Sequence, residues 1–582
     1  MLRVYRHLKK NDIIYILVSM AFIAGQVWLD LKMPDYMSEI TRLVQTPGSE
    51  MSQIIIAGLK MLGCALGSLL SAGCVAVLAA RIATDFGSDL RAEMFHKVMT
   101  FSKPEISRFS TASLITRTTN DVVQVQMLII MGMQSVIKAP MMGTLAIIKI
   151  AGKNWAWTLS TAIAIAITLI IAAIGITAML PKFRKVQQLT DDLNRVTREN
   201  LNGLRVIRAY NAEEYQESKF SKANTDLTDA HLFTGKVMAF VMPTVTLILN
   251  GLSLSIYMIG AAFIESAGAA DEKLLIFSDM IVFTQYAMQV FMAFMMLVVL
   301  FVIYPRAAVS AKRILEVMDT EVVVTDGNLS ASEDRGDIEF RNVSFRYPGA
   351  REDVLKKISF SVRKGETVAF IGATGSGKST LIDLVPRFYD ATEGEVLVDG
   401  RNVKEYTLHE LRNKIGYVSQ KAILFSGTVR SNVVFGKSDC DLESNLERSL
   451  EVAQAAEFVD GLTDRSDSAV AQAGANFSGG QKQRLSIARA VCRDPEIMIF
   501  DDSFSALDYK TDRMLRRELE DNCRGATKLI VAQRIGTIRD ADQIIVLDEG
   551  EMVGRGTHSE LMKECEVYRQ IALSQLSKEE LE

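Results

Sequence analysis

Apolar residues gather in long blocks before about residue 305, whereas the remainder of the chain mixes apolar and polar positions. A helix needs about 20 mostly apolar residues to cross a bilayer. Six blocks satisfy this length, and they cover roughly 13–33, 53–79, 127–151, 157–180, 237–264 and 274–304. Six such blocks with few charges favour six transmembrane helices over buried helices of a large soluble protein.

Two long polar segments separate span two from span three and span four from span five, and both keep helical periodicity. "RIATDFGSDLRAEMFHKVM" and "LTDDLNRVTRENLNGLRVIRAYNAEEYQESKF" predict helices that continue beyond the membrane. We expect the turns near "SKPEISRFSTAS" and "AYNAEEYQE" to contact a cytoplasmic domain, although solvated connectors would show the same pattern.

Positive charges orient these spans, because lysine and arginine accumulate on the cytoplasmic side. The N-terminal stretch "MLRVYRHLKK" and both long polar segments are basic. Trp28, Trp155 and Trp157 lie at predicted outer ends, where an amphipathic indole is stable. We expect a multi-pass protein of the plasma membrane, with the N-terminus and everything after Tyr304 in the cytoplasm.

Composition and length narrow the possible functions. The 582 residues exceed what one hydrophobic core supports, so at least two domains are expected. The net charge of −4 gives no reason to expect a nucleic-acid partner. The six cysteines are scattered and form no CxxC pair, which argues against a zinc site or a disulfide framework.

A nucleotide-binding signal appears in the second half. "TVAFIGATGSGKSTLIDLV" predicts a strand, a glycine-rich turn and a helix around the pattern GxxxxGK[ST]. Glycines let backbone N–H groups surround phosphate oxygens, and the helix N-terminus adds a favourable dipole. Lys378 is expected to reach the β- and γ-phosphates and Ser379 to ligate Mg²⁺. The predicted nucleotide-contacting residues here are Gly372, Thr374, Gly375, Ser376, Gly377, Lys378, Ser379 and Thr380.

Two further motifs extend this site. "IMIF" predicts a buried strand that ends at Asp501, beside the phosphate loop, where its carboxylate would hold Mg²⁺ through water. "FSGGQKQRLSIARA" places Ser478, Gly479 and Gly480 before an amphipathic helix, which is a second anion site. Because one ATP needs only one phosphate loop, this second site is expected to serve a nucleotide held by another chain.

Taken together, these features resemble the ATP-binding cassette (ABC) transporters of the exporter type, over nearly the whole chain. The motifs follow the family's order: the phosphate loop, "YVSQ" ending at Gln420, "FSGGQ", Asp501 and "SALD" ending at Asp508. Tyr347 in "VSFRYPG" matches the aromatic residue that stacks on adenine. The resemblance implies ATP and Mg²⁺ as cofactors, and a dimer of two half-transporters closing on two ATP molecules. It places Ser379, Gln420 and Asp501 at the metal, and it assigns nucleotide contacts in the closed dimer to Phe477, Ser478, Gly479, Gly480, Gln481 and Asp508.

The expected fold class is an all-α membrane domain of six transmembrane helices with cytoplasmic extensions, followed by an α/β ATP-binding cassette domain. The predicted limits are 1–319 for the transmembrane domain, 320–336 for a linker and 337–582 for the nucleotide-binding domain.

Two positions depart from the family's pattern at the residues that support hydrolysis. The general base is normally a glutamate, and here it is Asp502, whose side chain is one methylene shorter. A misplacement of about 1 Å can cost ~100-fold in rate. The histidine that contacts the γ-phosphate is replaced by Gln533, whose amide donates a hydrogen bond but carries no charge. Gln472 is a third departure, where exporters often place a glutamate shortly before the signature.

The "FSGGQ" signature is intact, whereas the residues that support hydrolysis in cis are altered. This asymmetry predicts one subunit of a heterodimeric exporter with a degenerate ATP site in cis. Its signature would complete the hydrolytic site of a partner that carries Glu and His. A homodimeric exporter of lipid or drug and a nucleotide-gated or regulatory membrane subunit with little turnover remain alternatives.

The substrate is expected only at the family level, as a hydrophobic or amphipathic compound. Span six is rich in methionine and phenylalanine, which suit either an adaptable cavity or interhelical packing. Gln134, Lys138 and Asn250 are polar within apolar runs and are expected to face the bundle interior or a cavity. For Lys138, snorkelling or a position near the inner interface is the alternative.

Overall fold

The computed structural model describes residue 3 and residues 9–46, 48–330, 336–436 and 442–575. The chain forms two compact units. The first contains Met1–Met99 and Ala112–Asp319, and the second contains Thr100–Thr111 and Thr320–Glu582. The domain limits expected from the sequence stay a prediction, because this division follows packing rather than chain order.

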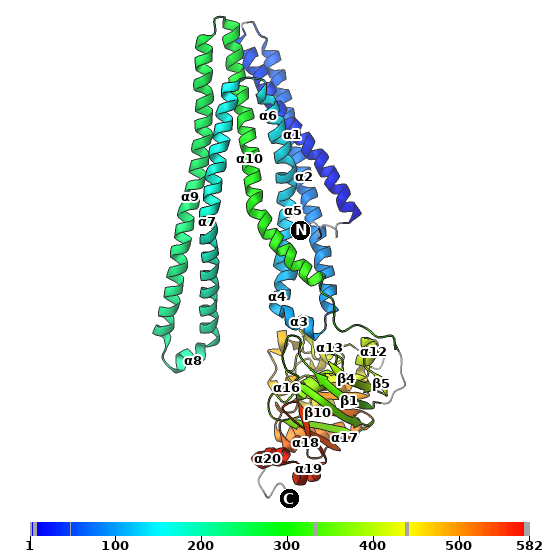
Figure 1. The fold of residues 1–582 in the computed structure, drawn as a ribbon. Coiled ribbons are helices and arrows are strands. Elements are labelled where there is room, and N and C mark those ends of the chain that lie inside the picture. The colour runs from blue at the N-terminus through cyan, green and yellow to red at the C-terminus, as the bar shows by residue number, and fades with distance from the viewer. Residues whose placement is uncertain (1–2, 4–8, 47, 331–335, 437–441, 576–582) are drawn as a thin grey trace. The chain divides into compact units, whose positions relative to one another are not determined.

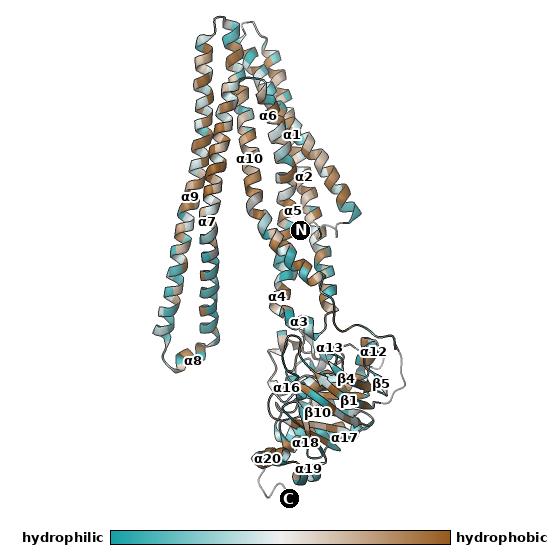
Figure 2. Ribbon diagram, viewed as in Figure 1, coloured by the Kyte–Doolittle hydropathy of each residue, from teal (hydrophilic) through white to brown (hydrophobic). Residues whose placement is uncertain are grey.

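Six helical segments in the first unit are long and apolar enough to cross a membrane, which confirms the six predicted spans (Figure 1). The predicted polar helical extensions are also confirmed, because α2 and α7 continue far beyond their apolar blocks, and their place in the cytoplasm stays a prediction. Figure 2 shows this change along α7 and α9, whose lengths near α8 are hydrophilic. The unbroken helices are α1 (Lys10–Gln45), α2 (Met51–Met99), α7 (Trp155–Asn202), α9 (Glu213–Ser266) and α10 (Ala270–Met318).

Span three is assembled from shorter pieces that include two π-helical turns. Its segments are α4 (Thr111–Thr116), η2 (Arg117–Asp121), α5 (Val122–Gly132), η3 (Met133–Lys138) and α6 (Ala139–Ala151). A π-helical turn inserts an extra residue into the helical repeat, so it rotates the side chains that follow it to another face. Charged residues that end these two turns, Asp121 and Lys138, both find partners on neighbouring helices.

The backbone of α1 around Pro34 is held by side chains of α10. Pro34 has no N–H group, so the carbonyl of Asp30 loses its helical donor. Gln289 Nε2 donates to that carbonyl at 3.1 Å, and the Tyr286 hydroxyl donates to the carbonyl of Leu31 at 3.0 Å. Two side chains one turn apart on α10 therefore satisfy the backbone next to the proline and fix α1 against α10.

Lys138 faces the helix bundle, as expected from its position in an apolar run. Its Nζ lies 3.3 Å from Asp30 Oδ2, and Ser68 Oγ donates to Asp30 Oδ1 at 2.5 Å. Gln134 is half-buried, whereas Asn250 is exposed on α9. Asn250 therefore does not lie in the packed interior of this chain, and its place beside a cavity stays a prediction. The apolar parts of α7 and α9 are mostly unburied in this chain, which accounts for the exposure of Asn250.

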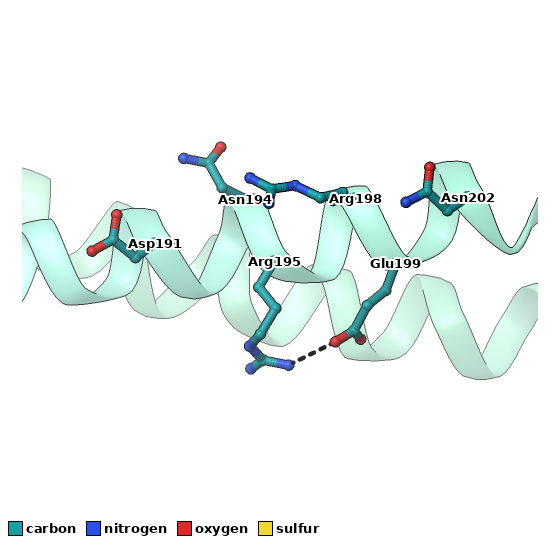
Figure 3. Close-up of a pocket in the computed structure, with 6 residues that line it drawn as sticks. All are labelled: Asp191, Asn194, Arg195, Arg198, Glu199 and Asn202. Atoms are coloured by element: carbon teal, nitrogen blue, oxygen red, sulfur yellow. Dashed lines mark hydrogen bonds and ion pairs between the residues drawn. The ribbon is translucent and has the colours of Figure 1, made fainter. Parts of the chain in front are cut away.

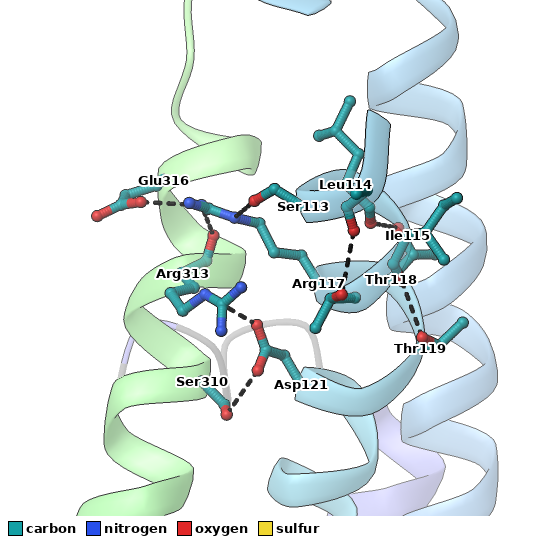
Figure 4. Close-up of polar contacts among 12 residues, drawn as sticks. Ser113, Leu114, Ile115, Arg117, Thr118, Thr119, Asp121, Ser310, Arg313 and Glu316 are labelled. Atoms are coloured by element: carbon teal, nitrogen blue, oxygen red, sulfur yellow. Dashed lines mark hydrogen bonds and ion pairs between the residues drawn. The ribbon is translucent and has the colours of Figure 1, made fainter. Parts of the chain in front are cut away.

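The polar extensions of span three and span six are joined by charged side chains (Figure 4). Asp121 is buried, accepts a hydrogen bond of 2.9 Å from Ser310 Oγ and lies 3.3 Å from Arg313 Nε. Arg117 donates to the carbonyl of Arg313 at 2.7 Å and to Glu316 at 2.8 Å. These contacts hold the end of α10 against η2.

The second unit is built on a six-stranded sheet with the order β12-β11-β3-β10-β9-β6. Neighbouring strands from β11 to β6 are parallel, and β12 is antiparallel at one edge. The central strands β9 and β10 are buried along their whole length, as expected for a sheet covered on both faces. The strands are β3 (Thr367–Gly372), β6 (Ile415–Val418), β9 (Ile497–Asp501), β10 (Thr527–Val531), β11 (Gln543–Asp548) and β12 (Glu551–Gly556).

A separate antiparallel sheet has the order β2-β1-β4-β5. Its strands are β1 (Ile338–Phe345), β2 (Leu355–Val362), β4 (Glu393–Val398) and β5 (Arg401–Asn402). With helices in one unit and a mixed α/β architecture in the other, the expected fold class is confirmed.

The short helix α3 (Lys103–Phe109) belongs to the second unit, although α2 and α4 on either side of it belong to the first. Its Lys103 Nζ lies 2.5 Å from Asp383 Oδ2. Glu105 caps the helix at Ser102 and also accepts a hydrogen bond of 3.1 Å from the Val323 amide. The predicted contact element near "SKPEISRFSTAS" is therefore confirmed.

The second expected turn lies within "AYNAEEYQE", at residues 210–212, and its contact with a cytoplasmic domain stays a prediction. The connection between α7 and α9 forms the short helix α8 over Leu204–Ala209, directly ahead of the turn that was expected around "AYNAEEYQE". No residue of α8 is buried. The two long helices beside it are joined by a 2.9 Å ion pair between Lys219 and Glu199.

Candidate nucleotide site

The predicted site residues meet at one edge of the parallel sheet. β3, β10, β9 and β6 lie side by side in parallel, so their carboxyl ends share an edge. Gly372 ends β3 and Asp501 ends β9, while Gln420 and Gln533 follow two residues after β6 and β10. This edge is where open α/β sheets bind their ligands.

The phosphate loop requires glycine at specific points. Gly377 caps α11 (Lys378–Asp383) with a φ of 96°, in the left-handed region that disfavours other residues. A Cβ on Gly372 would lie 2.0 Å from the Leu547 carbonyl oxygen, because β11 runs directly beside it. Thr374 and Gly375 are exposed on the loop, whereas Ser376 and Thr380 are buried beneath it.

Lys378 folds over its own loop. Its Nζ donates to the carbonyls of Gly372 and Ala373 at 2.8 and 2.7 Å, and to Ser376 Oγ at 3.3 Å. Burial lowers the pKa of Lys378, and the charges of Asp502 and Asp501 oppose that shift. The ammonium group is thus held next to the space above the loop, where an anion would attract it.

Ser379 and Asp501 are brought together as predicted. Ser379 Oγ donates to Asp501 Oδ1 at 2.7 Å. Burial raises the pKa of the Asp501 carboxyl, and the Ser379 hydroxyl lowers it. A hydroxyl and a carboxylate in contact at the end of a buried strand form an oxygen donor pair of the kind Mg²⁺ prefers.

Asp502 occupies a strained backbone position next to this pair. Its φ is 47°, in the left-handed region that aspartate tolerates better than most side chains. Its N–H donates to the Val531 carbonyl at 3.0 Å, which ties it to the end of β10. Gln533 Nε2 donates to Asp502 Oδ2 at 2.7 Å, and Gln420 Nε2 approaches the same oxygen at 3.4 Å. The two glutamines therefore converge on one carboxylate.

Asp501 and Asp502 are two buried carboxylates that lie side by side at this edge of the sheet. Burial is the main cause that raises the pKa of Asp502, while its hydrogen bonds to Gln420, Ser505 and Gln533 and the charge of Lys378 lower it. Adjacent buried negative charges favour a bound cation. The glycine cradle, the Lys378 ammonium and the Ser379–Asp501 oxygen pair thus fit the triphosphate of ATP with a magnesium ion.

Tyr347 lies at the margin of the phosphate loop. Its hydroxyl forms a 2.8 Å hydrogen bond with Thr380 Oγ1. Its ring meets the rings of Phe345 and Tyr389 edge-on, with centroids 4.9 and 5.3 Å apart. A half-buried ring held in this way is suited to stacking on a base.

The "FSGGQ" motif forms the start of α16 (Gly479–Cys492), with Ser478 as its N-cap. Ser478 Oγ accepts from the Gln481 amide at 3.3 Å, and Gln481 Oε1 accepts from the Ser478 amide at 2.9 Å. Phe477 is buried against Phe458, which anchors the turn.

The signature motif is largely exposed and is not hydrogen-bonded to the phosphate loop of its own chain in the described structure. Ser478 and Gly479 are exposed and Gly480 is half-buried. Over the described part of the chain, no hydrogen bond joins this motif to residues 372–380. The exposed N-terminal turn is therefore available to a ligand from outside the chain.

Asp508 has a local structural role. It is the N-cap of α17 (Tyr509–Asn522), and its side chain accepts from the Thr511 amide at 3.0 Å. That backbone hydrogen bond lowers the pKa of Asp508. The aspartate thus fixes the start of a helix that follows the catalytic edge.

Several residues at this site were missed by sequence reasoning. Asp383, at the end of α11, pairs with Lys103 and accepts a 3.3 Å hydrogen bond from the Tyr417 hydroxyl. Gln575, in the last described helix, bonds to the backbone beside Gln533. Neither position lies in a motif, so only the fold brings them to the site.

A cavity of about 440 Å³ lies elsewhere, along the polar part of α7 (Figure 3). Arg195 pairs with Glu199 at 3.2 Å on this face. The lining residues all belong to one helix, and they are Asp191, Asn194, Arg195, Arg198, Glu199 and Asn202. A hollow with polar groups from a single exposed helix offers no converging catalytic set.

Comparison with known proteins adds two family matches and several relatives. The model of the ABC transporter transmembrane region matches residues 13–309, and the ABC transporter model matches residues 355–505. An uncharacterised ABC transporter ATP-binding protein of Mycobacterium tuberculosis is 40% identical over 533 residues, covering 89% of this chain and 88% of that protein. An ATP-dependent lipid A-core flippase of Pseudomonas aeruginosa is 32% identical over 513 residues, covering 88% and 82%. The structure of a bacterial Atm1-family ABC exporter with ATP bound has a TM-score of 0.76 at 23% identity, with 98% of each chain covered.

Proposed function

Because the chain belongs to the ABC transporter family, as a half-transporter with one transmembrane region and one nucleotide-binding domain, we propose that it is one subunit of a heterodimeric exporter. In this proposal, Lys378, Ser379, Asp501, Asp502 and Gln533 bind ATP and turn it over slowly. The "FSGGQ" motif completes the hydrolytic site of a partner subunit that carries Glu and His.

The observation that carries this proposal is the Asp502–Gln533 contact. Gln533 donates a neutral amide hydrogen bond to the carboxylate that occupies the position of the general base. A general base must accept a proton from the attacking water, and a hydrogen bond at 2.7 Å to its oxygen uses one of its lone pairs. The pair can hold a nucleotide site in shape but supports proton transfer poorly, so ATP is expected to stay bound for long.

In the family, Mg²⁺ neutralises the phosphate charge that develops during transfer. Here Ser379 and Asp501 would hold that ion. Gln420 lies close to the Asp502 carboxylate and would add a polar group beside the ion. Tyr347 would stack on the base. Lys378 would exchange its two carbonyl partners for phosphate oxygens.

A partner chain also suits the exposed surfaces of the first unit. Around α8, Leu204, Val206 and Tyr210 are 48%, 62% and 79% exposed. Apolar side chains at the cytoplasmic end of helices are unfavourable in water and mark a protein contact. ABC exporters work as dimers in a lipid bilayer, so we assign this surface to the second half-transporter.

The substrate proposal stays at the level of chemical class. One relative is named as an ATP-dependent lipid A-core flippase. We propose that this chain and its partner export a hydrophobic or amphipathic compound. Met280 and Phe291 are buried in helix packing, whereas Met292 is 52% exposed, so it is a better candidate to face the substrate path.

The test compares the purified chain alone with the chain co-purified with a candidate half-transporter that carries Glu and His. ATP hydrolysis and ATP-dependent dye uptake into inverted vesicles are measured for both. We expect slow hydrolysis by the chain alone, and fast hydrolysis with uptake for the pair. Fast turnover by the chain alone would favour the homodimer, and nucleotide binding without uptake by the pair would favour a regulatory subunit.

A further inference from the structure

The loop that carries Gln533 is held by the last helix that the structure describes. α20 (Glu566–Gln575) ends with Gln575, whose Oε1 accepts a 2.9 Å hydrogen bond from the Ile535 amide. Its Nε2 donates to the Gln533 carbonyl at 2.7 Å. One side-chain amide therefore pairs with the backbone of both residues, as an adjacent strand would.

These two backbone groups need such a partner. Ile535 begins α18 (Ile535–Ile538), and the first N–H groups of a helix have no acceptor within it. Arg534 stands at the N-cap, and its side chain caps none of these N–H groups but donates to the Ser505 carbonyl at 3.4 Å. The Gln575 amide supplies the missing acceptor and, at the same time, a donor for the carbonyl just before the cap.

α20 is itself firmly anchored in the second unit. Tyr568 and Ala572 are fully buried, and the Tyr568 hydroxyl lies 2.7 Å from His558 Nδ1 in a hydrogen bond. Ile535 is also fully buried. The position of Gln575 therefore follows from the packing of α20, and the loop takes its position from Gln575.

This loop ends at the nucleotide site. The side chain of Gln533 donates to Asp502 Oδ2 at 2.7 Å, while its carbonyl is held by Gln575. The same residue thus connects the C-terminal helix to the catalytic edge of the sheet. A shift of the loop backbone would move the Gln533 amide away from Asp502.

We propose that Gln575 is a positioning residue of the nucleotide site, which fixes the backbone at Gln533 and Ile535 and so holds the Gln533 amide against Asp502. Gln575 touches neither Asp502 nor the phosphate loop in its hydrogen bonds, so it acts through Gln533. The proposal rests on the proposed function in one respect, which is that Asp502 and Gln533 face bound ATP.

The first test measures amide hydrogen exchange at Ile535 in the full-length chain. Gln575→Ala removes the acceptor, and the loss of one hydrogen bond should accelerate exchange about tenfold. Gln570→Ala is the matched control, because Gln570 is exposed on the same helix and bonds to Glu566 within it. Faster exchange in Gln575→Ala alone supports the proposal. Unchanged exchange in Gln575→Ala, or equal acceleration in both variants, would overturn it.

The second test follows release of radiolabelled ATP, with Mg²⁺, from the full-length chain. Gln575→Ala should release ATP about three- to tenfold faster in the natural background. In a Gln533→Ala background it should have no further effect, because nothing remains to be positioned. Equal acceleration in both backgrounds would show that α20 merely supports the fold, and no acceleration in either would show that the contact is irrelevant to the site.

The two tests separate failure of this inference from failure of the heterodimer proposal. Rapid hydrolysis by a homodimer would overturn the heterodimer, but the exchange at Ile535 would still decide whether Gln575 holds the loop. Normal exchange at Ile535 in Gln575→Ala would overturn the positioning role even if the heterodimer were correct.

Discussion

Gln533 Nε2 and Asp502 Oδ2 are 2.7 Å apart, and this hydrogen bond joins the ends of two adjacent strands, β10 and β9. In the proposed function, each of these residues replaces a catalytic group of the family. Their contact means that they form one unit, in which a neutral donor faces a short carboxylate. The two substitutions should therefore be tested together.

Restoring both residues should restore hydrolysis at the cis site. The double change Asp502→Glu with Gln533→His should raise ATP turnover about 100-fold, because general-base catalysis contributes on that order. Asp502→Glu alone should gain less. The measurement is steady-state ATPase activity of the full-length chain, and a triple variant with Asp501→Asn serves as the inactive control.

The Asp502→Glu substitution should also lower stability, because of the backbone conformation at this position. Asp502 has a φ of 47°, and a residue less suited to the left-handed region should lose about 1 kcal/mol of stability there. We therefore expect a small drop in the unfolding temperature of the Asp502→Glu variant, measured by thermal unfolding in detergent. An unchanged or higher temperature would argue against strain at this position.

The signature and the cis base should respond differently when the partner is present. Ser478→Ala should lower ATPase activity of the pair about 100-fold, as expected for loss of a donor aimed at transition-state charge. Asp502→Ala should change it much less. Because Ser478 also caps α16, helix stability is checked separately with Ser478→Gly, which costs only a few tenths of a kcal/mol at a cap. Equal losses in Ser478→Ala and Asp502→Ala would contradict the assigned asymmetry.

Removing the Lys103–Asp383 ion pair should lower the free energy of unfolding by an amount that depends on pH. Burial raises the pKa of Asp383, and Lys103 lowers it, so Lys103→Met should raise the Asp383 pKa further. In acid, Asp383 is protonated in both forms and the variant should lose little. As the pH rises through the Asp383 pKa, the carboxylate becomes charged without a partner, and the variant should lose about 1–2 kcal/mol. Thermal unfolding between pH 4 and 8 measures this, and a constant difference would contradict it.

The ion pair between Lys138 and Asp30 in the membrane domain should stabilise the chain more than the pair between Lys149 and Asp35. Both side chains are mostly buried, so Lys138→Met should destabilise the chain by about 3 kcal/mol by leaving Asp30 unpaired. The double variant with Asp30→Leu should recover much of that loss. Lys149→Met is the control: its pair with Asp35 is partly exposed and should cost about 0–1 kcal/mol. Thermal stability in detergent distinguishes these outcomes.

The sequence by itself determined the six spans, because an uninterrupted apolar block of bilayer length is unstable in water and forms a helix in lipid. It also determined the phosphate loop, whose glycines are required by the backbone shape at Gly372 and Gly377. The predicted neighbours Ser379 and Asp501 met as expected, since the ends of parallel strands share an edge. The spans and the loop follow from local pattern, and the Ser379–Asp501 contact follows from the general rule that the carboxyl ends of parallel strands lie together.

Only the tertiary structure decided which distant side chains meet. The pairing of Lys138 with Asp30 depends on a π-helical turn that rotates span three, and no periodicity in the sequence predicts that rotation. Asn250 was expected to face the bundle interior or a cavity, and it is exposed rather than packed in the interior of this chain, because packing sets the neighbours of α9. Lys103 reaches Asp383 across 280 residues, and Gln575 reaches Gln533 from the final helix. Contacts of this range follow from the folded arrangement of elements, which local pattern does not encode.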